Sequence, residues 1–226
     1  KLTTMTKDEQ NAVYADLQAA YEAYQALTED EQALLTGTEV FESLFHFFNG
    51  MVNLLAENGV SYLDKNGSKQ TADNVTVVES SMTTWNGGWY VVNSNVTIDN
   101  RVTVSGEVHL ILADNASLTA NGGINVAENN SFTVYAQSVG EKMGTLTATG
   151  ENGAGIGGRN GDRNGSSCGN ITIHGGSVAA TGGDEAAGIG GGVSGSGGNI
   201  TINGGNVTAT SGNEAAGIGG GQGDSG

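Results

Sequence analysis

The feature that most constrains this chain is a 29-residue segment that occurs twice in succession. Residues 169–197 read GNITIHGGSVAATGGDEAAGIGGGVSGSG, and residues 198–226 read GNITINGGNVTATSGNEAAGIGGGQGDSG. Ile171 and Ile200 are one example of an equivalent pair, and a weaker copy lies upstream over residues 146–158. A fixed period of this kind predicts a repeat architecture, in which equivalent residues of successive copies stack on one another.

The segment before the repeat consists of short runs rich in β-branched residues, separated by Asn, Asp, Gly and Ser. The runs are Val75–Val78, Trp89–Val92, Val96–Ile98, Val102–Val104, Val108–Leu112, Ser117–Thr119, Ile124–Val126 and Phe132–Tyr135. A 22-residue period aligns Val96 with Leu118, Val102 with Ile124, and Leu110 with Phe132. Strands of a few residues joined by short corners make one turn of a three-sided coil about this long.

These periods predict a right-handed parallel β-helix over residues 59–226. Its three sides in the first 29-residue copy would be Ile171–Ile173, Val178–Ala180 and Gly188–Gly190. In a parallel coil, identical residues lie above one another at about 4.8 Å, which also favours an asparagine ladder of Asn170 and Asn199. An antiparallel meander is the alternative, and it does not explain why like residues recur in register. A glycine-rich side can bend tightly and bring neighbouring backbones close together.

Residues 1–58 have a different pattern, which predicts an α-helical N-terminal cap. Thr6 with Glu9, and Thr28 with Glu31, form capping boxes at the start of apolar runs with helical spacing. Four of the five phenylalanines lie in this segment. A stack of coils has open ends that atypical segments cover, so we expect these helices to close the first coil. We also expect further coils to follow Gly226 in the parent protein.

Composition excludes several classes of partner. The chain carries 24 acidic and 8 basic side chains, a net charge of −16, so nucleic acid and anionic membrane surfaces are not expected to bind. No apolar run approaches the roughly 18 residues of a membrane span, so membrane insertion is not expected either. The single Cys168 cannot form an internal disulfide. Glycine is abundant, but the absence of proline and of a G-X-Y period excludes collagen.

Several stretches carry a family resemblance, namely Trp89 to Asp114, Ala186 to Gly192 (AAGIGGG), Gly198 to Gly205 (GNITINGG) and the helical opening Tyr24 to Gly50. The chain resembles the glycine-rich β-helical repeats of large cell-surface proteins from gut Gram-positive bacteria. The resemblance implies a pectin-lyase-like fold and a secreted or cell-wall location. This fold includes polysaccharide lyases, glycoside hydrolases, adhesins and passenger domains, so it does not choose an activity.

Two irregular places are the candidate binding sites. Trp85, Trp89 and Tyr90 form the aromatic group of the strand region, and exposed aromatic rings can stack on sugars. Sealing the junction between the helices and the first coil is the alternative role of this group. The longest corner contains Arg159, Asp162 and Arg163, which could bind a polar ligand, because insertions at one corner often mark a binding face. A solvated loop is the alternative there.

No catalytic residues are predicted. Gly153–Gly158 (GAGIGG) mimics a dinucleotide fingerprint, but no helix follows to meet a pyrophosphate. The three histidines, His46, His109 and His174, are scattered and lack ligand spacing. The other acidic groups are Asp99 with Arg101 and Glu107, and the aligned pair Glu185 and Glu214. Calcium could bridge the aligned pair, and no other cofactor is expected.

The sequence therefore predicts a non-enzymatic, secreted or cell-surface β-helical module. It would act as a structural stalk or as an adhesin that binds carbohydrate or another ligand on a host or cell surface. The alternative is the N-terminal part of a β-helix carbohydrate-active enzyme, either a glycoside hydrolase or a polysaccharide lyase, with its catalytic residues elsewhere.

Overall fold

The computed structural model describes residues 57–159 and 167–223, within the compact unit Glu57–Gly226. The predicted N-terminal helices lie, up to residue 56, outside the described residues, and so does the central part of the longest corner. Both therefore stay predictions.

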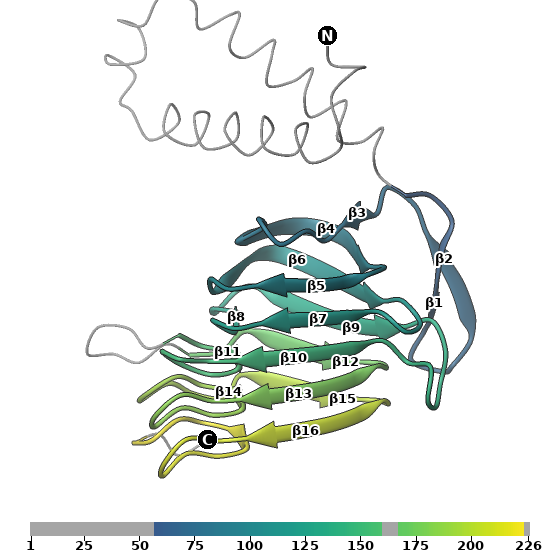
Figure 1. Ribbon diagram of the computed structural model, residues 1–226. Coiled ribbons are helices and arrows are strands. Elements are labelled where there is room, and N and C mark those ends of the chain that lie inside the picture. The colour runs from purple at the N-terminus through teal and green to yellow at the C-terminus, as the bar shows by residue number, and fades with distance from the viewer. Residues whose placement is uncertain (1–56, 160–166, 224–226) are drawn as a thin grey trace, which may run out of the picture. The chain divides into compact units, whose positions relative to one another are not determined.

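Parallel strands form three stacks, one on each side of a coil (Figure 1). The first stack contains β5 (Asn95–Ile98), β7 (Ser117–Ala120), β10 (Thr145–Thr149), β13 (Ser177–Thr181) and β16 (Asn206–Thr210). The second contains the beginnings of β4 (Thr84–Val92) and β6 (Val102–Leu112), β8 (Ile124–Asn125), β11 (Ile156–Gly157), β14 (Ile189–Gly190) and β17 (Ile218–Gly219). The third contains β3 (Thr76–Val77), the rest of β4 and of β6, β9 (Ser131–Ala136), β12 (Asn170–Ile173) and β15 (Asn199–Ile202).

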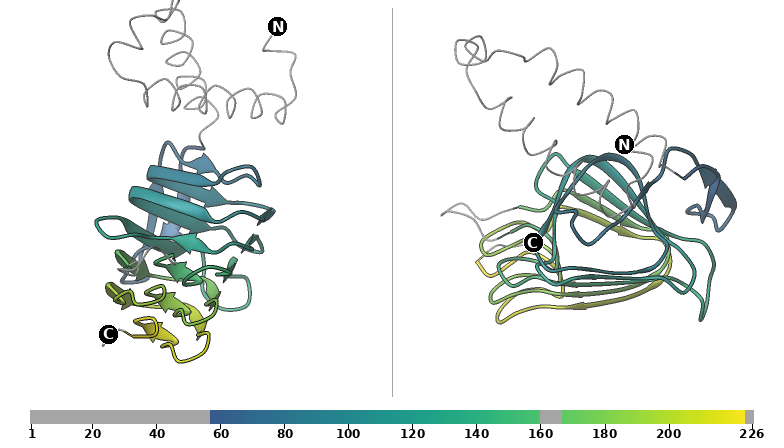
Figure 2. Two further views of the ribbon diagram at one scale, coloured as in Figure 1. Left: turned by 90° about the vertical axis from the view of Figure 1, so that its left-hand side faces the viewer. Right: turned by 45° about the horizontal axis from the view of Figure 1, so that its top comes forward.

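This arrangement confirms the parallel coil and excludes the antiparallel meander for the strands of the three stacks. The chain visits the stacks in turn and circles a common interior, as the right-hand view of Figure 2 shows. The right-handedness of the coil stays a prediction.

Two of the three 22-residue alignments are correct. Val96 pairs with Leu118, and Val102 pairs with Ile124. The third alignment is wrong by two residues, because Phe132 pairs with Val108 rather than with Leu110. β6 passes from the second side to the third as one strand, whereas the next coil places a corner between β8 and β9. The longer corner adds two residues, and an even shift keeps the same side chains facing inward.

The 29-residue repeat stacks in the predicted register. Asn170 pairs with Asn199, and Ile189 pairs with Ile218. The asparagine ladder is present, since Asn199 Nδ2 donates to Asn170 Oδ1 at 3.0 Å.

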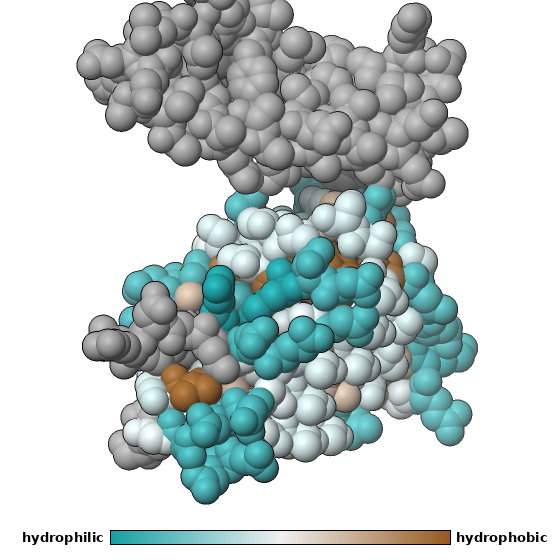
Figure 3. All heavy atoms as spheres, turned by 60° about the vertical axis from the view of Figure 1, so that its left-hand side comes forward, coloured by the Kyte–Doolittle hydropathy of each residue, from teal (hydrophilic) through white to brown (hydrophobic). Residues whose placement is uncertain are grey.

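The core is a continuous column of apolar side chains inside the coil. Its largest fully buried members include Trp85, Phe132, Leu110, Leu146 and Ile171. Burying one such aliphatic or phenylalanine side chain contributes about 1.5–3 kcal/mol, so inward positions on successive strands hold the coils together. In the face drawn in Figure 3, hydrophilic and near-neutral residues dominate the described surface, with few apolar side chains among them.

An antiparallel hairpin precedes the parallel strands and was not expected from the sequence. It consists of β1 (Val60–Leu63) and β2 (Lys69–Ala72), and we call residues 60–72 the strap. Its turn is Asp64–Gly67, in which Asp64 Oδ1 accepts from the backbone N–H groups of Asn66 and Ser68. The strap lies beside the coil in Figures 1 and 2 and packs against the outside of the third stack.

Candidate functional site

The outer surface of the third stack carries a row of aromatic side chains, which we call the aromatic strip: Trp89, His109, Tyr135 and His174. Trp89 and His109 are register partners on β4 and β6. Tyr135 lies on β9, and His174 directly follows β12. Side chains alternate along a strand, so the strip faces outward while the neighbouring inward residues enter the core.

The rings of the strip pack on one another from strand to strand. Trp89 and His109 are stacked, with ring centroids 4.5 Å apart and planes inclined by 20°. The centroid distance is 6.0 Å from His109 to Tyr135 and 5.0 Å from Tyr135 to His174. Aromatic pairs at such distances contribute about 0.5–1.5 kcal/mol beyond their area burial, so the strip holds its side chains in place.

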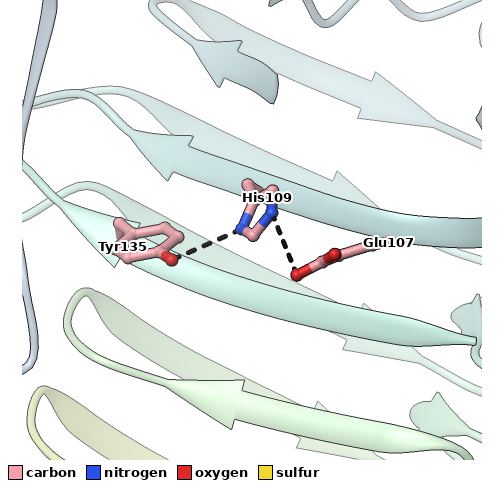
Figure 4. Close-up of polar contacts among 3 residues, drawn as sticks. All are labelled: Glu107, His109 and Tyr135. Atoms are coloured by element: carbon pink, nitrogen blue, oxygen red, sulfur yellow. Dashed lines mark hydrogen bonds and ion pairs between the residues drawn. The ribbon is translucent and has the colours of Figure 1, made fainter. Parts of the chain in front are cut away.

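A polar chain crosses the strip from Glu107 through His109 to Tyr135 (Figure 4). His109 Nε2 lies 3.4 Å from Glu107 Oε1, and the Tyr135 hydroxyl lies 3.3 Å from His109 Nδ1. Both contacts are satisfied by a neutral imidazole that carries its proton on Nε2 and accepts the tyrosine O–H at Nδ1. Burial lowers the pKa of His109, and Glu107 opposes this effect. The ring is therefore neutral near pH 7.

Tyr135 is a hydrogen-bond donor rather than a nucleophile at this site. Its side chain is 9% exposed, and burial, with smaller effects of Tyr62 and Glu107, raises its pKa to about 12. The phenol stays protonated in any ordinary buffer. The Glu107–His109–Tyr135 chain thus orients the rings and presents one accessible polar group, the Glu107 side chain, which is 72% exposed.

His174 extends the strip toward the second copy of the repeat. Asn203 Nδ2 lies 3.1 Å from His174 Nδ1, so this nitrogen also accepts a hydrogen bond. Burial lowers the pKa of His174, while Asp64 raises it and Lys65 lowers it further. The turn of the strap therefore lies within electrostatic range of His174.

The strap covers part of the strip. The Tyr62 ring lies 4.8 Å from the rings of both Trp89 and Tyr135. A small apolar cluster outside the coil joins the two elements, and its buried members are Val60, Ala72, Val75, Val91, Ile111 and Tyr135. Trp89 is left half-buried between the strap and the sheet.

The predicted aromatic group Trp85, Trp89 and Tyr90 does not form one surface. Trp85 is fully buried, with its ring 5.7 Å from Tyr90 and 6.0 Å from Phe132, and Tyr90 also points into the core. A buried ring offers no face to a sugar, so Trp89 alone remains a candidate. The register of β4 shifts between Asn86 and Gly88, which separates the inward Trp85 from the outward Trp89 despite their even spacing.

The second predicted group is only partly described. Arg159 is exposed, whereas Asp162 and Arg163 lie outside the described residues. Arg159 lies within electrostatic range of Arg101, whose pKa is lowered to about 10, mainly by burial and then by the charge of Arg159.

The acidic group expected around Arg101 is not assembled. Arg101 donates to the backbone oxygens of Gly122 and Ala154, at 3.0 Å each. Asp99 instead accepts from Asn121 Nδ2 at 2.8 Å, and Glu107 faces His109.

The sequence presents the three histidines as scattered, but two of them lie together in the aromatic strip. His109 and His174 are far apart in the sequence but lie on either side of Tyr135. A coil-by-coil alignment could have found them, but the two-residue error at Phe132 displaced β9.

Among the described residues, no three His, Cys, Asp or Glu side chains are grouped to hold a metal ion. Glu185 and Glu214 occupy equivalent left-handed positions, with φ of 57° and 54°, and calcium there stays a prediction.

Comparison with known proteins supports the repeat. A family model described as a beta helix repeat matches residues 144–162, 171–193 and 200–222, so the chain contains a β-helix repeat region. No curated protein and no solved structure matches the chain. In the part of the chain that the structure describes, there is no helix of the length and apolarity needed to cross a membrane.

Proposed function

We propose that this chain is a non-enzymatic β-helical module of a secreted or cell-surface protein, serving as a rigid stalk or adhesin that binds carbohydrate through the aromatic strip. The resemblance of its repeats to those of gut Gram-positive surface proteins supports the location. The in-register stacking of identical residues supports the scaffold role, because each added coil lengthens the stack by about 4.8 Å.

The observation that carries the binding role is the combination of Trp89 with the exposed carboxylate of Glu107 on a rigid sheet. Sugars offer apolar ring faces to aromatic side chains and hydroxyl groups to polar ones, and binding sites commonly combine the two. The strip also runs across successive strands, so consecutive units of a glycan chain could contact consecutive coils.

A glycan array with the whole chain, followed by calorimetric titration of the best ligand, tests this proposal. We expect Trp89→Ala to weaken binding at least tenfold and Trp89→Phe to restore part of it. Because Trp89 also packs against the strap, Glu107→Ala provides a second variant with little effect on folding, and we expect it to weaken binding several-fold. Glu151→Ala removes an exposed carboxylate at the corner between β10 and β11, outside the third stack, and is the matched control.

Two results would contradict the proposal. An array without any bound glycan would refute the carbohydrate role and leave only a stalk. Shortened or unsaturated products in the bound fractions would refute the non-enzymatic role. The alternative, the N-terminal part of a β-helix glycoside hydrolase or polysaccharide lyase whose catalytic residues lie elsewhere, predicts no products from this chain and products from the parent protein.

A further inference from the structure

The strap depends on the sheet beneath it. An isolated two-stranded hairpin is marginally stable in water, so β1 and β2 need the apolar contacts of Val60 and Ala72 with the outer face of the third stack. Tyr62 adds ring contacts to Trp89 and Tyr135. If these contacts were lost, the strap would leave the sheet and its hairpin would unfold at the same time.

Two histidines lie where the strap meets the strip, and each accepts a hydrogen bond at Nδ1. His109 Nδ1 faces the Tyr135 hydroxyl, and His174 Nδ1 faces the Asn203 amide nitrogen. A protonated imidazole carries N–H groups on both nitrogens and accepts nothing. Protonation would thus force the Tyr135 hydroxyl to turn away from His109 and the exposed Asn203 amide to turn its oxygen toward His174.

We propose that the strap is a pH-sensitive cover of the aromatic strip, closed while His109 and His174 are neutral and released when both rings are protonated. The titratable and charged groups facing His109 are Glu107 and Tyr135. Those facing His174 are Asp64, Lys65 and Tyr135. Tyr62 of the strap packs on the Trp89 and Tyr135 rings. Tyr135 stays neutral throughout the relevant range.

The direction of the effect follows from linkage. Burial lowers the pKa of both histidines in the closed arrangement, against the partial opposition of Glu107 and Asp64. Opening returns each ring toward its ordinary pKa of 6.5, so the open state binds more protons. Closure is fully favoured above about pH 6.5 and is lost as the pH falls below it.

A consequence for ligand binding rests on the proposed function. Tyr62 packs against the Trp89 ring, where a sugar would stack. Release of the strap would free that ring, so glycan affinity should rise as the pH falls from 7.5 to 5.5.

Hydrogen exchange of the backbone amides of β1 and β2 tests strap opening without any ligand. Protection factors at pH 7.5 and 5.5, each corrected for the intrinsic exchange rate, report the open fraction. We expect the open fraction to rise at pH 5.5 by up to about tenfold for each histidine, the limit for a ring that protonates only when open. Amides of β7 and β10 should keep their protection and serve as an internal reference.

The variant His109→Gln/His174→Gln should lose the pH response of the strap, whereas His46→Gln, which removes the third histidine, should retain it. Equal strap protection at both pH values, or a full response in the double variant, would overturn the proposal. A strap that opens in acid while no glycan binds would refute the proposed function and leave the cover intact. Glycan binding with unchanged strap protection would refute the pH-sensitive cover and leave the proposed function intact.

Discussion

At the scale of single residues, the glycines of the second stack allow neighbouring backbones to approach closely. Gly157, Gly190 and Gly219 stand above one another with φ of 136°, 136° and 138°. A Cβ built on Gly157 would lie 2.0 Å from Gly190 O, and one on Gly190 would lie 1.9 Å from Gly219 O. Both the backbone conformation and the lack of space therefore require glycine.

Alanine substitutions at Gly190 and Gly219 distinguish the effect of the positive φ from the effect of the close backbone approach. Gly219 shares the φ of Gly190, but among the described residues a Cβ there would meet only the Cβ of Ala216, at 3.2 Å. We expect Gly219→Ala to cost about 1–3 kcal/mol of unfolding free energy through backbone strain. Gly190→Ala should cost clearly more, because the coils must also separate. Urea denaturation followed by circular dichroism measures both, and equal losses would show that the close approach is unimportant.

At the scale of elements, Arg101 fastens corners of three coils. Its guanidinium donates to Gly122 O on the next coil, and to Ala154 O and Gly158 O on the coil after that. These bonds place a charged donor against several corner carbonyl groups, of which Gly158 O also accepts from the backbone N–H of Ala154.

Removing this side chain should loosen the corners. We expect Arg101→Met to lower the free energy of unfolding by about 2–4 kcal/mol, since several hydrogen bonds to a charged group are lost. Arg159→Met removes an exposed arginine from the corner after β11 and should change the free energy of unfolding by less than about 0.5 kcal/mol. Equal effects in urea denaturation would indicate that surface charge matters there and not the carbonyl contacts.

At the scale of the whole molecule, the apolar column joins the coils into one structure. A single buried cluster extends from Val78 to Ile189 and includes Cys168, the chain's one cysteine. Burial raises the pKa of this thiol to about 12, against an opposing hydrogen bond to the backbone of Gly158. The native thiol is therefore both enclosed and protonated at pH 8.

Cys168 consequently reports on the cooperativity of the stack. We expect it to resist a thiol reagent such as Ellman's reagent at pH 8 in the native protein and to react fully once unfolded. With increasing urea, the midpoint of labelling should coincide with the midpoint of the circular dichroism transition. Labelling at a lower urea concentration would show instead that the described coils open one at a time, as weakly coupled repeats do.

The sequence alone determined the parallel coil, its three sides and the register of the 29-residue copies. Stacking places identical residues above one another, so a constant period is enough to predict these pairs, as Ile189 and Ile218 show. The strands could also be predicted, because runs of β-branched residues alternate with turn residues.

Only the tertiary structure decided where the candidate site lies. The shift in β4 that turns Trp85 inward and leaves Trp89 outside depends on how two strands pair, and the corner before Phe132 depends on how the chain bends. The aromatic strip needs both, because it joins residues of three strands and the corner after β12 with no common spacing. The strap is the clearest case: its hairpin turn is a local signal, but its position follows from apolar contacts with Val91, Ile111 and Tyr135, which no local pattern encodes.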